Sequence, residues 1–266
     1  MRIKNEKFEN RRKKLAIAIR KPSEIEEIKK AGKIVGKTLK LLRENAKPGV
    51  TPLELDKMAE DFIRSQNARP AFKGLYDFPN AVCISKNGVV IHGIPDNEPL
   101  KEGDVVGFDV GAELNGWYGD AAITVGIGNI KEEHQKMIDV AKGALYHAIE
   151  NIKPGMRYKQ ISKLIEDYIT SHGYVPLRGY SGHGIGRKPH EEPQILNYVE
   201  GKPNQGEKVK NGHVFCLEPM LCHKNGEPVL GEDGWSVYCE DLDVGVHYEH
   251  QIAVVENRAI ILTEEN

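Results

Sequence analysis

The chain has 266 residues, 39% of them hydrophobic, and a formal net charge of −2 at pH 7. That length and apolar content allow one large core or two merged halves. The small net charge creates no overall field that would favour nucleic acid or a membrane as the main partner, so any basic patch must be local.

The first segment, residues 1–14, is basic and has no periodic apolar face. We expect it to be a flexible arm ahead of a single domain over residues 15–266. A contact of this arm with ribosomal RNA or another polyanion is an alternative that depends on Arg-Arg-Lys-Lys at 11–14 alone. No apolar run approaches the ~20 residues that span a bilayer, and residues 15–19 are too short for a signal-peptide core. We therefore expect the protein to stay in the compartment where it is made.

Four stretches carry apolar residues at helical spacing and predict helices over residues 24–45, 52–66, 132–151 and 158–172. Ser23, followed three residues later by Glu26, forms a capping box for the first helix. Thr51 is the expected cap of the second, with Pro52 at its first position. A Lys-Pro-Gly breaker separates the two helices of each pair.

The two helix pairs belong to an internal repeat. Residues 44–67 and 150–173 align without gaps, with identity at 10 of 24 positions. The two segments end at Asn67 and Gly173, the residue types that most readily take a left-handed cap conformation. Chance similarity between amphipathic helices explains part of the match, but the shared breaker favours duplication.

The segments that follow each helix pair correspond as well. His-Gly-Ile at 92–94 recurs at 183–185. Apolar segments rich in β-branched residues and bounded by turns predict strands in both halves. Two helices followed by antiparallel strands, twice over, predict an α+β fold in which two helix pairs flank an antiparallel sheet.

Each half also carries two acidic residues at equivalent places. The segment "GDVVGFD", ending at Asp109, matches "GHVFCLE", ending at Glu218. The segment around Asp120 matches the segment around Glu249 in the same way. We expect these four carboxylates to converge on a shared centre, together with a histidine.

The turn between the first two acids sets their geometry. Asn115-Gly116 is a strong signal for a two-residue hairpin turn, which pairs residues whose numbers sum to 231. Asp109 therefore faces Ala122, and Asp120 lies on the same face of the sheet, diagonally across at ~7–8 Å between backbones. Carboxylates at this separation repel each other unless a cation or a proton neutralises them.

Four carboxylates and one imidazole form an oxygen-rich set that suits Mn²⁺, Fe²⁺, Co²⁺ or Zn²⁺ and can balance two such ions. Two ions ~3.5–4 Å apart would bridge a water, lower its pKa and supply hydroxide for attack on a carbonyl. The reaction class implied is hydrolysis. For any single acid, the alternative is a surface ion pair or a charge at a strand edge. Five candidates related by a repeat favour a metal site instead.

Three of the ten histidines are candidates for this site. His183 lies between glycines, which permit close backbone approach and suit a ligand. His92, its counterpart in the repeat, could hydrogen-bond the substrate, and His190 could donate to a developing oxyanion. We expect the other seven to be surface or packing residues without a role, among them His213, His247 and His250.

The cysteines predict a reducing environment. They include no C-x-x-C pair, which excludes a zinc ribbon and a thioredoxin-like motif. The four residues are Cys83, Cys216, Cys222 and Cys239. This usage fits the cytoplasm best.

The chain resembles the type I methionine aminopeptidases of bacteria over about residues 15–264. Five motifs, in order, carry the resemblance: "VCIS…IHGIPD", "FDVG…GWYGDAA", "GHGIGRKPHEEP", "FCLEPM" and "YEHQIAV". The resemblance implies the pita-bread fold with a pseudo-two-fold repeat, in a single catalytic domain. It also implies a cytoplasmic enzyme that removes the initiator methionine from nascent proteins when the second residue is small.

The resemblance further implies roles for individual residues. Two divalent ions, Co²⁺, Mn²⁺, Fe²⁺ or Zn²⁺, would be held by Asp109, Asp120, His183, Glu218 and Glu249. Asp120 and Glu249 would bridge the ions, and Glu218 would carry a proton to the leaving amine. His92 and His190 would contact the scissile amide. The methionine pocket would comprise Phe72, Leu75, Phe78, Cys83 and Trp235.

Some points remain open at this level. Leu75 fits core packing as well as it fits the pocket. The chain departs from the family at Pro189, where an aromatic is frequent, and at Ala121 and Ala122, which replace polar residues near the metals. The partners implied are nascent polypeptide N-termini, with a transient ribosome contact, no membrane, no specific nucleic acid and a monomeric state.

Two rival functions compete with this one. A proline-directed aminopeptidase or dipeptidase of the same fold usually carries a large additional N-terminal domain, and residues 1–23 are too few for one. A non-catalytic member that binds protein or RNA should have lost ligands, whereas all five positions hold competent side chains.

Overall fold

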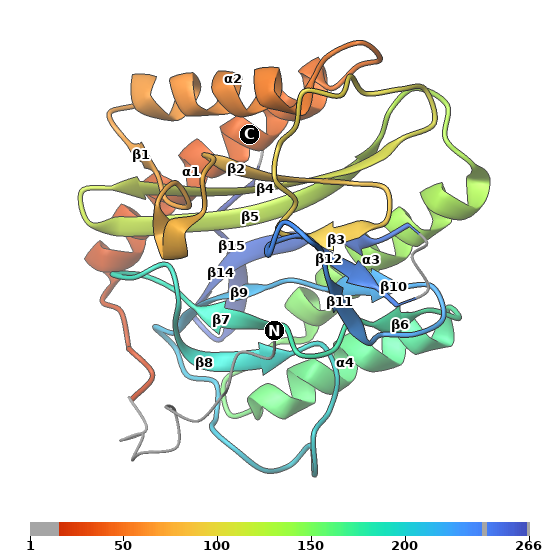
Figure 1. Cartoon of the computed structure of the whole chain (residues 1–266). Helices are drawn as coiled ribbons and strands as arrows, with labels where there is room; N and C mark the ends of the chain where they lie inside the picture. The colour runs from red at the N-terminus through yellow and green to blue at the C-terminus, as the bar shows by residue number, and fades with distance from the viewer. Residues whose placement is uncertain (1–15, 241–243, 265–266) are drawn as a thin grey trace.

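The computed structural model describes residues 16–240 and 244–264, so the predicted basic arm, residues 1–14, lies outside the described part (Figure 1). Four α-helices form where the sequence predicts them: α1 (Pro22–Asn45), α2 (Pro52–Ser65), α3 (Glu132–Asn151) and α4 (Tyr158–Ser171). In the described residues, no helix has the length and apolar character needed to cross a membrane.

The helix caps agree with the prediction at α2 and differ at α1. Thr51 accepts a hydrogen bond from the Glu54 backbone, and Glu54 accepts one from the Thr51 backbone. The predicted box of Ser23 and Glu26 is wrong. The helix begins at Pro22, which fits the first position because it has no N–H to satisfy, and Glu24 accepts the Lys21 N–H at 2.9 Å.

Most strands belong to one antiparallel sheet with the order β1-β4-β5-β14-β9-β7-β8. Two further strands belong to this sheet, because β2 pairs with β4 and β15 pairs with β14. Its strands are β1 (Arg69–Pro70), β2 (Val82–Lys86), β4 (Val105–Leu114), β5 (Trp117–Gly126), β7 (Ser181–Gly184), β8 (Glu191–Leu196), β9 (Val214–Leu217), β14 (Glu249–Val255) and β15 (Arg258–Ile261). The two halves of the chain meet where β5 pairs with β14.

Two small sheets complete the fold. One joins β13 (Val246–His247), β10 (Met220–Cys222) and β6 (Val175–Pro176). The other joins β11 (Pro228–Leu230), β12 (Val237–Cys239) and β3 (Val89–Ile91), and a short 3₁₀ helix η1 spans Leu75–Asp77.

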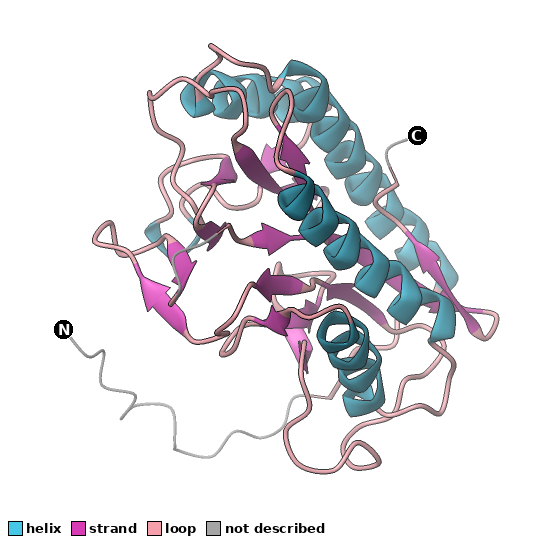
Figure 2. Cartoon of the chain, turned by 90° about the vertical axis from the view of Figure 1, so that its right-hand side faces the viewer, coloured by secondary structure: helices cyan, strands magenta, loops and turns pink. Residues whose placement is uncertain are grey.

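The helices cover the strands and supply the core. Apolar residues of α1 and α2 pack against β2, β4 and β5, and those of α3 and α4 pack against β9 and β14. Figure 1 shows one helix pair over each half, and Figure 2 shows the longer helices along one side of the strands. This arrangement confirms the predicted α+β class, with an antiparallel sheet flanked by two helix pairs.

The internal repeat is visible in matching backbone contacts. Gly49 and Gly155, the breaker glycines, both have a φ of 92°, which favours glycine. The Gly49 N–H donates to the Leu100 carbonyl at 2.8 Å, and the Gly155 N–H donates to the Val209 carbonyl at 2.9 Å. The two helix pairs are therefore attached to the rest of their halves in the same way.

The hairpin of β4 and β5 has the predicted register. Asp109 pairs with Ala122 and Gly111 pairs with Asp120, as the two-residue turn requires. Both residues of that turn, Asn115 and Gly116, have positive φ.

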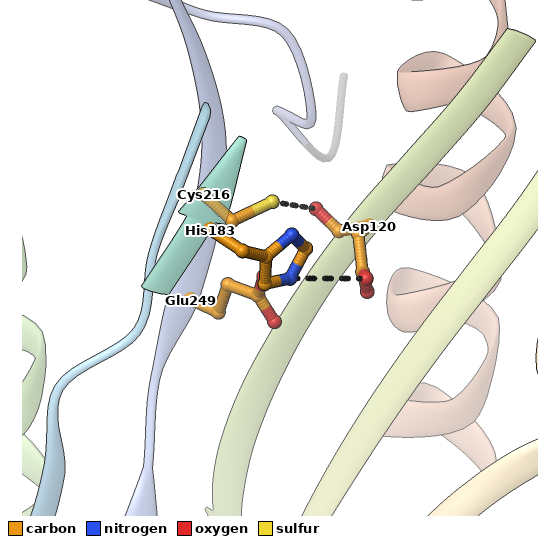
Figure 3. Close-up of side chains that lie close together, drawn as sticks. All are labelled: Asp120, His183, Cys216 and Glu249. Carbon is orange, nitrogen blue, oxygen red and sulfur yellow. Dashed lines mark hydrogen bonds and ion pairs between the residues drawn. The ribbon is translucent and has the colours of Figure 1, made fainter. Parts of the chain in front are cut away.

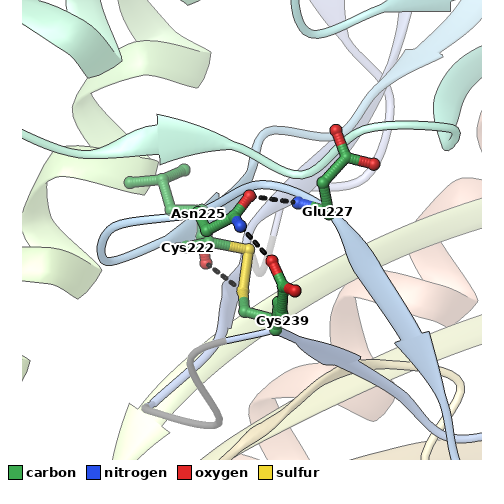
Figure 4. Close-up of a disulfide and its surroundings, with 6 residues drawn as sticks. Cys222, Asn225, Glu227 and Cys239 are labelled. Carbon is green, nitrogen blue, oxygen red and sulfur yellow. Dashed lines mark hydrogen bonds between the residues drawn. A yellow bond between two sulfur atoms is a disulfide. The ribbon is translucent and has the colours of Figure 1, made fainter.

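A disulfide joins Cys222 at the end of β10 to Cys239 at the end of β12 (Figure 4). Their Cα atoms lie 5.8 Å apart, and both residues are fully buried. This bond differs from the reducing environment that the cysteines predicted. The sequence could not place the pair, because β10 and β12 belong to different small sheets that only the tertiary fold brings together. Cys83 and Cys216 are buried free thiols.

Close packing of α1 on β5 fixes the strand that carries Asp120. A Cβ at Gly119 would lie 2.7 Å from backbone atoms of Ala31 and Gly32 in α1, whereas a Cβ at Gly107 on β4 would have ordinary contacts of 3.5 Å or more. We expect Gly119→Ala to lower the free energy of unfolding by about 1–3 kcal/mol because the helix must shift. Urea denaturation measures this, with Gly107→Ala as the matched control. Equal effects of the two variants would contradict the packing argument.

Candidate metal centre and substrate pocket

A cavity of about 900 Å³ is lined by residues of both halves. All twelve candidate residues from the sequence line it: Phe72, Leu75, Phe78, Cys83, His92, Asp109, Asp120, His183, His190, Glu218, Trp235 and Glu249. The structure therefore brings together every side chain that the sequence placed in the site.

The acidic residues reach the cavity from neighbouring strands of the main sheet. Asp109 and Asp120 lie on β4 and β5, Glu218 follows β9, and Glu249 begins β14. His183 Nε2 lies 3.8 Å from Asp120 Oδ2 and 3.6 Å from Glu218 Oε1. Figure 3 shows His183, Asp120 and Glu249 directed toward one another. These separations suit donors that share an ion at about 2.0–2.2 Å from each.

Glycines on both sides of His183 allow its strand to fit, as the sequence predicted. A Cβ at Gly182 would lie 2.4 Å from the Cys216 carbonyl oxygen, and one at Gly184 would lie 2.1 Å from the Glu192 carbonyl oxygen. His183 Nδ1 lies 3.0 Å from the Gly184 carbonyl oxygen. Because a carbonyl can only accept, we assign the proton to Nδ1, which leaves the Nε2 lone pair free for an ion.

Burial raises the pKa of every carboxyl group in the cluster. The pKa of Asp109 rises from 3.8 to about 7, because of burial. Burial and then the neighbouring carboxylates raise the pKa values of Asp120, Glu218 and Glu249 well above the usual range. Burial, with a smaller contribution from His190, lowers the pKa of His183 to about 3. Neutral imidazole is the form that binds metals.

The same cluster has buried oxygens without partners. Asp109 Oδ1, Asp120 Oδ1 and Glu249 Oε1 are covered from solvent and accept no hydrogen bond. An unpaired buried carboxylate is costly unless a cation or a proton compensates its charge. Several oxygens with one neutral imidazole match the donors that first-row divalent ions prefer, so the residues present fit a divalent metal site.

An apolar pocket adjoins the acids. Phe72, Phe78 and Cys83 form a buried cluster against which Leu75 and Trp235 pack. The Phe78 and Trp235 rings meet edge to face, with centroids 5.1 Å apart. Burial and then Asp109 raise the pKa of the Cys83 thiol, so it forms a neutral wall of the pocket.

Two further histidines line the same cavity as the acids. The His190 ring packs edge to face on the His183 ring at 4.5 Å between centroids. His92 packs edge to face on Tyr180 at 5.7 Å. Burial, and then His190, lower the pKa of His92 to about 4, so its imidazole is neutral at neutral pH. A neutral imidazole can donate one N–H to a substrate.

The sequence missed several residues near the site. Tyr76 is 71% exposed and stacks on His190 with 6.2 Å between ring centroids. Its backbone has a φ of 51°, a conformation that the sequence did not predict. Cys216 offers a sulfur within 4.8 Å of donor atoms of Asp120, His183 and Glu249. It precedes Glu218 by two residues, a spacing at which strand alternation could have placed it on the same face.

One of the histidines expected to have no role lies beside the acids. His213, His247 and His250 were expected at the surface or in packing, and all three are buried. His250 bonds Tyr146 and Thr263, as a packing residue would. His247 instead lies next to two acids of the cluster, 3.8 Å from Glu218 and 3.9 Å from Glu249. It precedes Glu249 by two residues, the same alternation signal that applied to Cys216.

Comparisons with known proteins show which family this chain resembles. The profile of metallopeptidase family M24 matches residues 26–256. A methionine aminopeptidase of Helicobacter pylori is 54% identical over 252 residues, covering 94% of this chain and all of that protein. The Bacillus subtilis protein named methionine aminopeptidase 1 is 39% identical over 93% of this chain and 99% of its own length.

Solved structures give the same result. The methionine aminopeptidase structure from Thermotoga maritima has a TM-score of 0.91 and 39% identity, covering 94% of this chain and all of that one. The prolidase of Pyrococcus furiosus has a TM-score of 0.77 and 26% identity, covering 93% of this chain but 66% of that one.

The raised pKa values predict how pH affects the metal-free protein. Above about pH 7.5, roughly one unit over the ordinary imidazole pKa, the buried histidines are neutral in both the folded and unfolded states, so the acids decide how stability changes with pH. Their raised pKa values mean that the folded state holds protons that the unfolded chain has released. The destabilisation from Asp109 is complete once the pH passes about 7, whereas Asp120, Glu218 and Glu249, whose pKa values are raised well above the usual range, continue to lower stability as pH rises further.

We expect the melting temperature of the metal-free protein to fall between about pH 7.5 and 8.5 and that of the Mn²⁺-loaded protein to fall less, because ions replace the protons. Differential scanning calorimetry measures both, the loaded protein being the control. A metal-free protein that gains stability over this window would contradict the assignment.

Proposed function

Because this chain belongs to metallopeptidase family M24, we propose that it is a methionine aminopeptidase, a metal-dependent hydrolase that removes the N-terminal methionine from polypeptides. One observation carries the proposal: four carboxylates and a histidine face a cavity that continues into an apolar pocket. A thioether side chain fits such a pocket, because methionine is apolar and flexible.

The family uses metal, and we propose that this chain holds two divalent ions. The residues that would hold them are Asp109, Asp120, His183, Glu218 and Glu249. The donor set supports Mn²⁺, Fe²⁺, Co²⁺ or Zn²⁺. When bound, the ions polarise the scissile carbonyl and activate the water that attacks it.

The chain's own residues bind the substrate and move the proton. Glu218 takes up the proton that the attacking water loses and passes it to the leaving amine, a role that its position on the cavity supports. His92 and His190 donate hydrogen bonds to the scissile amide from the same cavity. The apolar cluster around Phe72 and Phe78 excludes water from the methionine side chain. We further propose that the second residue of the substrate is small.

The substrates proposed are nascent polypeptide N-termini, processed in the cytoplasm and with a transient ribosome contact. A monomer is sufficient for the reaction, because one chain supplies all the proposed ligands and pocket residues. No role for a membrane or a specific nucleic acid is proposed.

A panel of peptides tests the reaction. Tripeptides that begin Met-Ala, Met-Lys and Leu-Ala, and dipeptides that end in proline, are assayed with Mn²⁺, Co²⁺, Zn²⁺ or, without oxygen, Fe²⁺. Release of methionine from the Met-Ala peptide alone is the expected result. Cleavage of the proline dipeptides instead would favour a prolidase, and no turnover with any ion would favour a binding protein.

A substitution tests the role of Glu218. We expect Glu218→Gln to lower kcat/KM by about 10²-fold or more, because the amide can neither carry the proton nor supply negative charge to the ions. Glu192→Gln, a change of the same chemistry on the same cavity, is the control and should alter kcat/KM by less than about threefold. Full activity of the Glu218 variant would exclude the proposed role.

A further inference from the structure

His247 is a buried histidine that the proposed mechanism does not use. It lies on β13, is 4% exposed, and its Nε2 atom has no hydrogen-bond partner. Nε2 lies 3.8 Å from Glu218 Oε2 and 3.9 Å from Glu249 Oε2. A buried polar atom without a partner that faces two carboxylates is either strained or able to form a bond once the site is complete.

Two hydrogen bonds hold the backbone of His247 in place. The His247 N–H donates to Thr124 Oγ1 at 3.1 Å, and the Thr124 hydroxyl donates to the His247 carbonyl oxygen at 2.7 Å. Thr124 is buried on β5, the strand that also carries Asp120. On its other side, β13 pairs with β10, where His247 is opposite Met220. The backbone of His247 is therefore fixed relative to β5, the strand that carries Asp120.

The two oxygens of Glu218 face different histidines. Oε1 lies 3.6 Å from His183 Nε2, and Oε2 lies 3.8 Å from His247 Nε2. His183 gives its N–H to the Gly184 carbonyl and directs a lone pair toward the acids. A carboxylate oxygen only accepts hydrogen bonds, so the partner that Glu218 Oε2 requires on its other side is an N–H. His247 is therefore assigned a proton on Nε2, whereas His183 carries its proton on Nδ1.

We propose that His247 is a positioning residue of the metal centre, which donates its Nε2–H to the carboxylates of Glu218 and Glu249 and so directs their other oxygens toward the ions. The proposal rests on the metal site put forward above. Glu249 Oε1, the oxygen that this arrangement leaves for an ion, is buried and has no other partner. Histidines and carboxylates that orient ligands in this way typically change metal affinity by about 10–100-fold.

The test uses two variants that differ only in reach. A glutamine at this position places an amide N–H near the site of Nε2, whereas an asparagine reaches only as far as Nδ1. We expect His247→Asn to weaken binding of Mn²⁺ to the full metal-free chain by about 10–100-fold, and His247→Gln to weaken it by less than about threefold. Isothermal titration calorimetry measures both affinities. Wild-type affinity in the asparagine variant, or equal loss in both variants, would overturn the proposal.

His213→Asn is the matched control for the loss of a buried imidazole. His213 is also buried and bonds the Tyr158 hydroxyl at 2.6 Å. We expect this variant to lower the melting temperature of the metal-free protein and leave the Mn²⁺ affinity unchanged. If it weakens Mn²⁺ binding as much as His247→Asn does, the effect is general packing and the proposal fails.

Proton NMR of the Co²⁺-loaded chain distinguishes a positioning role from direct ligation. A histidine bound to Co²⁺ gives a strongly shifted exchangeable N–H signal, and we expect one such signal, from His183. A second signal that disappears in His247→Gln would make His247 a ligand and overturn the proposal. A wild-type chain that takes up no Mn²⁺ or Co²⁺ would instead refute the metal site and the function proposed from it.

Discussion

The burial of four carboxylates at one point is the constraint on which the rest of this structure depends. Among the described residues, the basic side chains that lie close to these acids are His183 and His247, and both are neutral because burial lowers their pKa values. No neighbouring Lys or Arg in the described part of the chain supplies the missing positive charge. Removing a charge from water costs several kcal/mol without a close counter-charge, so the fold is completed by protons or by metal.

The duplicated architecture explains how the acids come to one place. The first half contributes the acids on β4 and β5, and the second half contributes those at β9 and β14. The halves join where β5 pairs with β14, with Glu249 opposite Ala122. Asp120 and Glu249, the equivalent acids of the two halves, therefore lie two register positions apart across the junction, on the same face of the sheet. The disulfide adds a covalent link nearby, because Cys222 follows Glu218 by four residues and Cys239 follows Trp235 by four.

Local sequence signals predicted the parts of this fold that depend on neighbouring residues. Apolar periodicity predicted the four helices, and the Asn115-Gly116 turn was sufficient to place Asp109 opposite Ala122. The predicted capping box of Ser23 and Glu26 is wrong, because the helix begins earlier, at Pro22, with Lys21 as its cap. The disulfide could not be predicted, because its two strands are brought together only by tertiary packing.

The candidate site shows the same division. The acids and His183 could be found because motifs and the repeat marked them. His247, at the end of β13, has no such motif, and it was therefore predicted to be a surface or packing residue. The period of two that relates His247 to Glu249, and Cys216 to Glu218, was present in the sequence. Tyr76 had no such signal, because its place depends on the unusual backbone of η1.

The position of β14 in the sheet has a consequence for how the chain folds. This strand comes late in the chain, yet it lies in the middle of the main sheet between β5 and β9, and it carries one of the proposed ligands. During synthesis, β4, β5, β7 and β9 leave the ribosome first, and the gap between β5 and β9 stays open until β14 enters it. Such pairing between distant segments is slow to nucleate, because the entropy of loop closure is lost before contacts form. Completion of the ion-binding centre is therefore a late event that reports a fully assembled chain.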